Sequence, residues 1–574
     1  MNLINDQWIP VRHADGSVDK IAPWEVTKDI NDEKKMIVAV ASPRPDFDGA
    51  LTQFLIGLLQ TACTPETEDD WWVWQEKQPI PEQLQSLFNP FAASFELEGE
   101  GPRFMQDFQP DELSEISGIA ALLIETPGEN ALKKGTDHFV KRDKVKQLCS
   151  HCAAAAIYTL QLNAPAGGAG NRTGLRGGGP LTTLILGKSL WETCWINVLI
   201  KSNYFSNSIN TCENESPLRF PWREKTRISN KGTGQDTYFG DMHPDQLFWA
   251  MPRRIFLIDE DSTMTEACDL CGNKTDKMYR KYKNKNYGVH YMGAYEHPLS
   301  PHYIKNNAPS PIHPQPGGVI YSHWLGLVEN SSEGDNKRRP AKVVNQFRSL
   351  TLVDAQLWAF GFDMDKAKAR CWYSAKMPVL HIEDSFSSIF SSHSTNMIKT
   401  SRYVSGLLVA AVLKGQMAEP RPSRNDAGYL EIDWKWPKDL LGRLRKSPTE
   451  KTKVIEKKIN AFVEELDSRV QKSMMCLLDS ARLNFWSITE DDFYDHLKKI
   501  RDAIINRNNE HHILESWVSI LKEEAIKIFD RHVNSDDFNA VDPKRIAIAR
   551  NELVRSLNSD RLRNIIGLPK NINK

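Results

Sequence analysis

The chain has 574 residues, of which 40% are hydrophobic and 26% are charged, and these are ordinary values for folded proteins. Because this length exceeds what one hydrophobic core usually supports, we expect two or three domains. The formal net charge of −1 excludes a protein that coats polyanions indiscriminately, since such proteins carry a broad excess of Lys and Arg. Any contact with nucleic acid must therefore be local.

The sequence also indicates a compartment. The first 30 residues lack the apolar core of a secretory signal and include Asp6, Asp15, Asp19 and Glu25. The longest apolar stretches, such as residues 406–413, fall short of the ~18 residues needed to span a bilayer. Nine cysteines are an odd number for a disulfide scaffold and favour reduced thiols or metal binding. We expect a cytoplasmic protein without a membrane partner.

Residues 1–380 mix short strand-like runs with Gly- and Pro-rich turns and a few helical patterns. The strand-like runs include residues 181–186 and 318–321. This mixture predicts an irregular α/β domain. Two features of this region, the cysteines and the glycines, carry the functional interpretation.

Two C-x-x-C pairs, Cys149 with Cys152 and Cys268 with Cys271, are separated by 115 residues. Each pair can present two thiolates to one ion, and two pairs complete a tetrahedral, closed and therefore structural zinc site. Gly272 suits the turn of such a knuckle, because glycine accepts positive φ. The spacing is also compatible with unrelated buried thiols or a redox pair, and His151 is a possible competing ligand.

Residues 164–180 hold seven glycines and two arginines. Glycines let a backbone approach a groove or phosphate closely, and Arg172 and Arg176 could supply charge, which is the chemistry of a contact loop. An ordinary glycine-rich turn between strands is the alternative.

A basic run at residues 280–286 has Tyr279, Tyr282 and Tyr287 interleaved with its lysines. Lysine and tyrosine together suit phosphate and groove contacts, whereas a charged run is also typical of a solvated surface. Beyond it, Asp363 and Asp365 form a D-x-D that we interpret as a turn.

From about residue 385 the pattern changes to apolar residues at helical spacing. We expect helices over residues 388–414, 454–470, 491–505, 513–529 and 545–557. Thr489 and Glu490 are plausible helix-start residues. Several antiparallel helices of this length predict a helical bundle in residues 381–574.

Several stretches in the order expected over residues 1–375 resemble the CasA family, the large subunits of the type I-E CRISPR surveillance complex called Cascade. They are residues 2–11 (NLINDQWIPV), 104–106 (FMQ), both cysteine pairs, 174–183 (GLRGGGPLTT), 293–301 (GAYEHPLSP), 343–348 (VVNQFR) and 369–373 (ARCWY). The resemblance implies an α+β protein, with a mixed α/β domain that holds the zinc site followed by a four-helix bundle. It also implies a non-catalytic subunit that works with crRNA, the other Cascade subunits and a helicase-nuclease.

The resemblance further implies recognition of the protospacer-adjacent motif (PAM) in double-stranded DNA through the minor groove. In this family a glycine loop, a lysine and a hairpin wedge contact the DNA. The loop corresponds to Ala166, Gly167, Gly168, Ala169 and Gly170, followed by Asn171 and Arg172, and Ala169 stands where relatives can have glycine. The lysine corresponds to Lys285 or Asn286, and the charge favours Lys285.

The wedge corresponds to Asp365 and Lys366, where relatives can have asparagine and glutamine. Asp365 would repel phosphate, and Lys366 would attract it. The resemblance places Lys133, Lys134, Lys141 and Arg142 in a loop near the crRNA 5′ handle and the PAM.

Two other functions compete with this interpretation. One is an architectural zinc protein that holds partners without touching DNA. The other is a metal-dependent nuclease that uses Asp363 and Asp365 with His297 and His302. A nuclease would need a metal site with an open coordination position.

Overall fold

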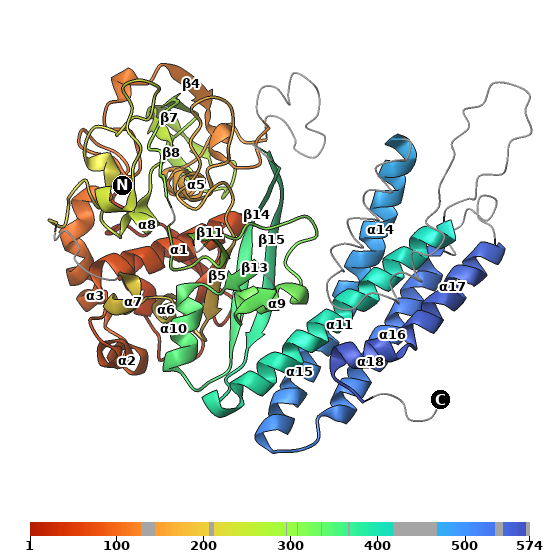
Figure 1. Ribbon diagram of the computed structural model, residues 1–574. Helices are drawn as coiled ribbons and strands as arrows, with labels where there is room; N and C mark the ends of the chain where they lie inside the picture. The colour runs from red at the N-terminus through yellow and green to blue at the C-terminus, as the bar shows by residue number, and fades with distance from the viewer. Residues whose placement is uncertain are drawn as a thin grey trace, which may run out of the picture. The chain divides into compact units, whose positions relative to one another are not determined.

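The computed structural model describes residues 1–127, 144–205, 212–293, 295–306, 308–333, 336–365, 368–416, 468–533 and 543–569. The chain forms two compact units, each with its own core (Figure 1). The first comprises residues 1–319 and 325–381, and the second comprises residues 320–324 and 382–574. The first unit is mixed α/β and the second is helical.

The core of the first unit surrounds helix α1 (Pro45–Ala62), which has no charged residue after Asp48 and is buried along most of its length. A helix that is apolar all round must be covered on all sides. It packs against α5 (Ser150–Asn163), α6 (Leu190–Ile196) and α8 (Gln246–Trp249). Phe54 of α1 makes edge-to-face contacts with Tyr158 of α5 at 5.5 Å and Trp249 of α8 at 5.6 Å. Helix α5, which begins beside the first cysteine pair, is thus fixed in the core.

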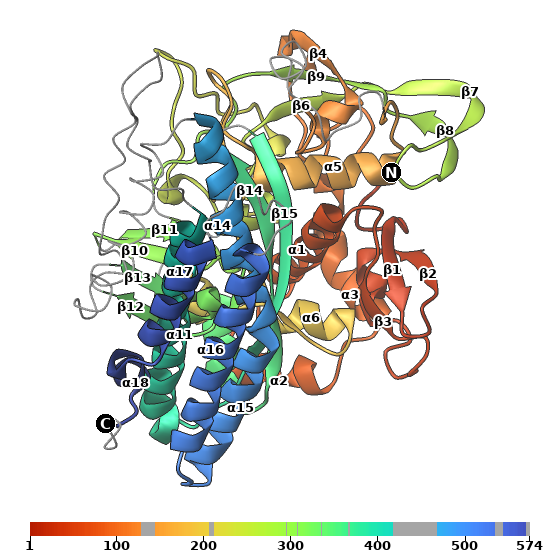
Figure 2. The same cartoon turned by 90° about the vertical axis from the view of Figure 1, so that its right-hand side faces the viewer.

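The strands of this unit form small antiparallel sheets (Figure 2). The described sheets are β2-β1-β3, β4-β9-β6, β7-β8, β11-β10-β13-β12 and β15-β14-β5. Their strands are β1 (Ile9–His13), β2 (Val18–Ile21), β3 (Ile37–Val40), β4 (Glu115–Gly118), β5 (Thr182–Leu186), β6 (Arg254–Leu257), β7 (Glu260–Ala267), β8 (Lys274–Met278), β9 (Lys281–Lys285), β10 (His302–Lys305), β11 (Ala308–Pro311), β12 (Ser331–Glu333), β13 (Asn336–Arg339), β14 (Ala355–Asp365) and β15 (Lys368–Val379). Short helices α2 (Glu68–Glu76), α3 (Pro81–Phe88), α7 (Lys201–Tyr204) and α10 (Lys342–Leu350) also belong to this unit, and so does all of α9 (Trp324–Leu327) except its first residue.

The strand predicted at residues 181–186 is confirmed as β5, but the strand predicted at residues 318–321 is wrong. Gly317 and Gly318 have φ of 92° and 79°, in the left-handed region that breaks a strand. The chain then turns into the 3-10 helix Tyr321–His323.

Strand β9 explains the basic run around residues 280–286. Side chains alternate along a strand, so Tyr282 points into the core while Lys281 and Lys285 are exposed. Tyr279 is also fully buried. The interpretation of these two tyrosines as groove contacts is therefore wrong, because they anchor the strand and leave only the lysines on the surface.

The second unit contains helices α11 (Asp384–Gln416), α14 (Ser468–Ile488), α15 (Glu490–Ile505), α16 (His511–Val533), α17 (Pro543–Leu557) and α18 (Asp560–Ile566). These confirm the helices expected at residues 388–414, 491–505, 513–529 and 545–557. Most of the helix expected at residues 454–470 lies outside the described residues. Thr489 directly precedes α15 but donates to the Phe485 carbonyl at 2.7 Å instead of capping the helix.

The segment Ile320–Trp324 belongs to this helical unit although it lies between strands of the first. Tyr321 is fully buried, stacks on Phe493 of α15 at 4.5 Å, and shares a hydrogen bond of 2.9 Å with the Thr489 hydroxyl. None of the described helices combines the length and apolar character needed to cross a membrane.

Candidate metal centre and nucleic-acid interface

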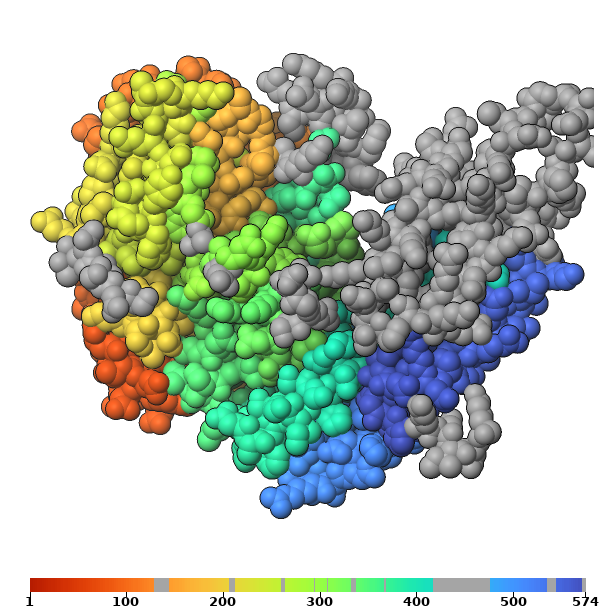
Figure 3. All heavy atoms as spheres, in the orientation of Figure 1, coloured from red at the N-terminus to blue at the C-terminus, as the bar shows by residue number. Residues whose placement is uncertain are grey.

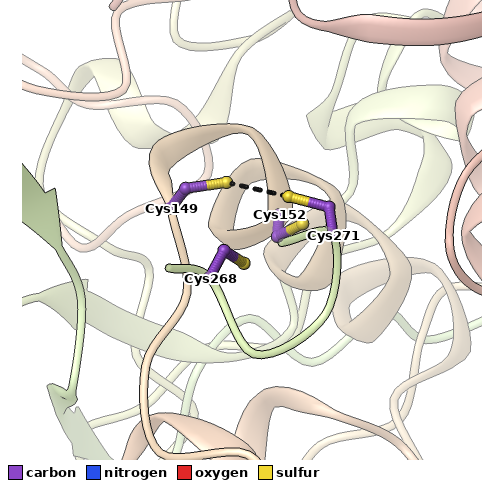
Figure 4. A group of neighbouring side chains, drawn as sticks. All are labelled: Cys149, Cys152, Cys268 and Cys271. Carbon is purple, nitrogen blue, oxygen red and sulfur yellow. Dashed lines mark hydrogen bonds between the residues drawn. The ribbon is translucent and has the colours of Figure 1, made fainter. Parts of the chain in front are cut away.

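The four cysteines of the two C-x-x-C pairs come together in one cluster (Figure 4). Their sulfur atoms all lie within 4.8 Å of one another, and the sulfurs of Cys149 and Cys271 are 3.6 Å apart. Four thiolates around a zinc ion at a Zn–S distance of about 2.3 Å would lie about 3.8 Å apart. The cluster therefore fits a tetrahedral metal ion. All four thiols are free, and three of them are buried.

Local structure holds each pair in place. Cys149 and Cys152 lie at the start of α5, whereas Cys268 and Cys271 lie in the turn between β7 and β8. In that turn Gly272 has φ of 71° and donates its N–H to the Cys268 carbonyl at 2.9 Å, as the knuckle requires. Leu148 and Tyr279 exchange two backbone hydrogen bonds, of 3.0 and 2.8 Å, which join the two segments directly.

The hydrogen bonds among the four thiols lower the pKa of two of them, whereas the pKa of Cys149 and that of Cys152 are raised. Hydrogen bonds from Cys149 and Cys152 lower the pKa of Cys268 and bring that of Cys271 to about 7. Thiolate is the form that binds zinc. His151, the possible competitor, instead accepts a hydrogen bond from the Lys20 ammonium at 2.8 Å through Nδ1. It lies outside the group of metal-binding side chains found among the described residues.

Glu98 joins the surroundings of both cysteine pairs. It accepts hydrogen bonds from Ser150 at 2.9 Å and Tyr279 at 2.6 Å, and it forms an ion pair with Lys277. Burial opposes ionisation, but the hydrogen bonds from Lys277, Tyr279 and Ser150 lower the pKa of Glu98 to about 2. Ser150 belongs to the first pair's helix, and Tyr279 follows the second pair. A single carboxylate therefore reinforces the connection that a metal would make.

The glycine loop, residues 166–170, follows the C-terminal end of α5, where Ala166, Gly168 and Ala169 are exposed. Gly168 and Gly170 have φ of 60° and 81°. A Cβ on Gly170 would lie 2.9 Å from the Tyr287 ring and 3.0 Å from Asn286 Cβ, whereas one on Gly168 would meet only Asn171, at 3.7 Å. Glycine is therefore required at 170 for space as well as conformation.

Residues 285–287 lie against this loop. Tyr287 donates its N–H to the Gly170 carbonyl at 2.8 Å, and the Asn286 side-chain amide donates to the Ala169 carbonyl at 3.0 Å. Lys285, the last residue of β9, is exposed, and no hydrogen bond or ion pair to its ammonium group is found among the described residues. Asn286 thus supports the loop, while Lys285 presents the charge.

The two arginines of the glycine-rich segment do not project as free charges. Arg172 donates to the Ser229 hydroxyl at 2.7 Å and to its carbonyl at 2.6 Å, and its guanidinium lies 5.8 Å from the Tyr287 ring centroid. Arg176 is fully buried and donates to Gln53 at 2.7 Å. The idea that Arg176 supplies surface charge is therefore wrong.

The hairpin of β14 and β15 is described up to the pair Asp365 and Lys368. Asp363 is buried and makes a bidentate ion pair with Arg370, at 2.7 and 3.0 Å, whereas Asp365 is exposed. A bulge between Asp363 and Met364 changes the register near the tip. Lys366 lies outside the described residues, as do Lys133, Lys134, Lys141 and Arg142, and Figure 3 draws such residues in grey.

The carboxylates and histidines of the nuclease alternative do not assemble into a site. His297 and His302 are buried, and burial lowers the pKa of His297 well below its usual value and that of His302 to about 4. Asp363 is already neutralised by Arg370. Within the described residues, the four cysteines are the one group of His, Cys, Asp and Glu side chains placed to hold a metal.

The fold and its site define a mixed α/β protein with a helical C-terminal unit and a four-cysteine cluster whose geometry fits a metal ion. Residues 2–528 match the family of CRISPR-associated protein Cse1, so the chain belongs to that family. The resemblance to the CasA large subunits of type I-E Cascade is thereby confirmed.

Solved structures share the fold at low sequence identity. The crystal structure of CasA from Thermus thermophilus matches with a TM-score of 0.63 and 16% identity, over 97% of this chain and 99% of that one. Thermobifida fusca Cse1 matches with a TM-score of 0.63 and 14% identity, over 99% and 98%. A chain of a structure described as a CRISPR RNA-guided surveillance complex has a TM-score of 0.63 and 14% identity, over 97% and 99%.

The two positive-φ glycines of the loop predict different responses to alanine. Gly168→Ala should cost about 1 kcal/mol of unfolding free energy, since only the backbone conformation is penalised. Gly170→Ala should cost about 2–4 kcal/mol, because its Cβ also overlaps Tyr287 and Asn286. Urea unfolding of both variants measures the difference. Equal losses would contradict the close packing of Gly170 against residues 286–287.

Proposed function

We propose that this chain is the non-catalytic large subunit of a crRNA-guided Cascade complex that recognises the PAM in double-stranded DNA. In this proposal it reads the minor groove, helps to begin strand separation and R-loop formation, and recruits the helicase-nuclease. The membership in the Cse1 family supports this role, as does the similarity in fold to a chain of an RNA-guided surveillance complex.

One observation carries the proposal. The exposed glycine loop and the exposed Lys285 come from segments more than a hundred residues apart, yet they are joined by the hydrogen bonds of Asn286 and Tyr287 to the loop. A backbone without bulky side chains can enter a narrow groove, and a lysine beside it can reach base acceptors on the groove floor. Arg172 supports the loop in this proposal, while Ala166, Gly167, Gly168, Ala169, Gly170 and Asn171 face the DNA.

Minor-groove reading has a consequence for specificity. The groove floor distinguishes mainly A·T from G·C pairs, so we propose that this subunit accepts more than one PAM sequence. Ala169 adds a methyl group where relatives can have glycine, which limits how closely the loop can approach.

We assign the strand-separating wedge to Asp365, the last residue of β14, and to Lys366, which lies outside the described residues. The bidentate ion pair of the buried Asp363 with Arg370 and the close packing of the β14–β15 hairpin on the glycine-rich segment support a rigid base for such a wedge. A Cβ on Gly179 would lie 2.6 Å from Met364 Cγ, so these segments already touch. A wedge needs such a base, because it must press on stacked bases without yielding.

The metal is proposed to be structural zinc, held by Cys149, Cys152, Cys268 and Cys271. Four thiolates leave no open coordination position for a substrate, so zinc would connect the start of α5 to the β7–β8 turn. Strand β8 leads from this turn to β9, so the metal would also stabilise the strand that ends at Lys285.

The remaining assignments concern partners and architecture. We propose that Lys133, Lys134, Lys141 and Arg142 approach the crRNA 5′ handle, and that the chain acts in the cytoplasm with the other Cascade subunits. Residues 1–380 are the proposed DNA-reading domain and residues 381–574 a four-helix bundle. In this bundle α11 and α16 would each form one of the four helical segments. The third segment would be α14 continued by α15, and the fourth would be α17 continued by α18. The packing of α11 against all of these helices supports the arrangement.

Binding of duplex DNA by the reconstituted complex tests the proposal. The complex with its guide RNA is measured with and without this chain, on matched targets with a functional or a scrambled PAM. PAM-dependent binding should appear only when the chain is present. Equal binding without it would favour the architectural alternative, and DNA cleavage by the purified chain in magnesium, manganese or zinc would favour the nuclease.

A further inference from the structure

Arg253 lies between the two parts of the proposed PAM-reading site, which are Lys285 on β9 and the glycine loop. No pattern in the sequence indicates a role for this position. Its neighbour Arg254 is the first residue of β6 and pairs with Lys285 in the β6–β9 ladder. Its other neighbour, Pro252, is covered by Gly288, where a Cβ would lie only 2.2 Å from the Pro252 carbonyl oxygen. The backbone at residues 252–254 is thus packed directly against the strand that carries Lys285.

The guanidinium of Arg253 contacts the glycine loop, which is the other part of the site. One terminal nitrogen donates to the Asn171 side-chain oxygen and the other to the Pro165 carbonyl. These two acceptors flank the glycine loop, residues 166–170, on both sides. One planar guanidinium therefore holds the two ends of the loop together. The loop itself, with three glycines and two alanines, has no side chain that could do this.

The backbone of Arg253 is fixed as firmly as its side chain. Its N–H donates to the Gln161 side-chain oxygen at 2.9 Å, and its carbonyl accepts from the Gln161 amide at 3.0 Å. Gln161 is buried in the last turn of α5, the helix that begins at the cysteine cluster. Arg253 is therefore held by a rigid element while it holds the loop.

We propose that Arg253 is the positioning residue of the PAM-reading site, which sets the shape of the glycine loop and its distance from Lys285. This inference rests on the proposed function. Arg253 does not touch DNA in this role. A loop of five small residues samples many conformations, and the arginine selects the one in which its backbone and Lys285 face the same groove.

The test measures PAM discrimination, the ratio of affinities for functional and scrambled PAMs, in the complex reconstituted with Arg253→Met. Discrimination should fall about tenfold, since two hydrogen bonds to a charged group order the loop. Amide hydrogen exchange of residues 166–171 should become faster. Arg253→Lys keeps the charge but cannot reach both acceptors, so its PAM discrimination should remain below that of the wild type.

Controls separate positioning from folding. Arg280→Met removes an arginine that pairs with Glu266 just before β9, at the end away from Lys285, and should leave discrimination unchanged. If Arg253→Met does not fold, Arg253→Lys takes its place, since it keeps the charge and the aliphatic stem, and it should also lower discrimination and speed exchange in the loop.

The wild-type chain and Lys285→Ala are measured in parallel. A wild-type complex without PAM discrimination would overturn the proposed function itself. If wild type discriminates and Lys285→Ala does not, but folded Arg253→Met matches wild type in both discrimination and loop exchange, only the positioning role of Arg253 is wrong.

Discussion

Replacing Cys268 by serine should remove the bound metal and destabilise the first unit by at least ~3 kcal/mol. Serine preserves the size of the side chain but cannot supply a thiolate, and structural zinc sites contribute much of the folding free energy of small domains. The loss is moderated here because Leu148 with Tyr279, and Glu98 with its three partners, still join the same segments. The metal content of the purified chain and its thermal unfolding measure the two effects.

Cys371→Ser is the matched control, because Cys371 is an exposed, free thiol on β15 outside the cluster. It should leave both metal content and unfolding temperature unchanged. Chelation of the wild-type protein should reproduce the effect of Cys268→Ser. A wild-type preparation that carries no metal and is as stable as Cys268→Ser would show that the four thiols pack without an ion.

Lys285→Ala should lower the discrimination between functional and scrambled PAMs by about 1–3 kcal/mol, the range for a side chain that contacts base edges. The lysine is exposed at the end of β9, directly before the two residues that support the glycine loop. Duplex binding by the reconstituted complex at several salt concentrations measures this effect.

Lys281→Ala is the control from the same strand. Lys281 is also exposed but lies four residues earlier, about 13 Å from Lys285 along the strand. It should not alter discrimination. A uniform loss of affinity in Lys285→Ala, with a salt slope shallower by about one, would identify Lys285 as a phosphate contact rather than a base reader.

The cysteine cluster was the most predictable part of the site. A C-x-x-C pair places two thiols close together, whereas a tetrahedral ion needs four ligands. The presence of a second pair, 115 residues away, therefore predicts that the two pairs meet at one ion. Helices α11, α15, α16 and α17 were equally accessible, because helical periodicity over fifteen or more residues is a strong signal.

Side-chain direction was much less predictable. A sequence motif with two arginines and seven glycines does not reveal that Arg176 points into the core toward Gln53 or that Arg172 turns to Ser229. Both partners are supplied by distant segments. Arg253 gave no signal at all, since two adjacent arginines at the start of a short strand are common, and only the folded chain brings Arg253 to both ends of the loop.

The segment Ile320–Trp324 affects how this protein can be divided. Because Tyr321 fills a place between Phe493 and Thr489, residues 382–574 on their own would expose the apolar surface that this tyrosine covers. The helical unit therefore cannot be separated from the chain, or replaced, by a simple cut at residue 381. A truncated version would need the five-residue strap supplied in trans, or a rebuilt surface, before its behaviour could represent that of the intact chain.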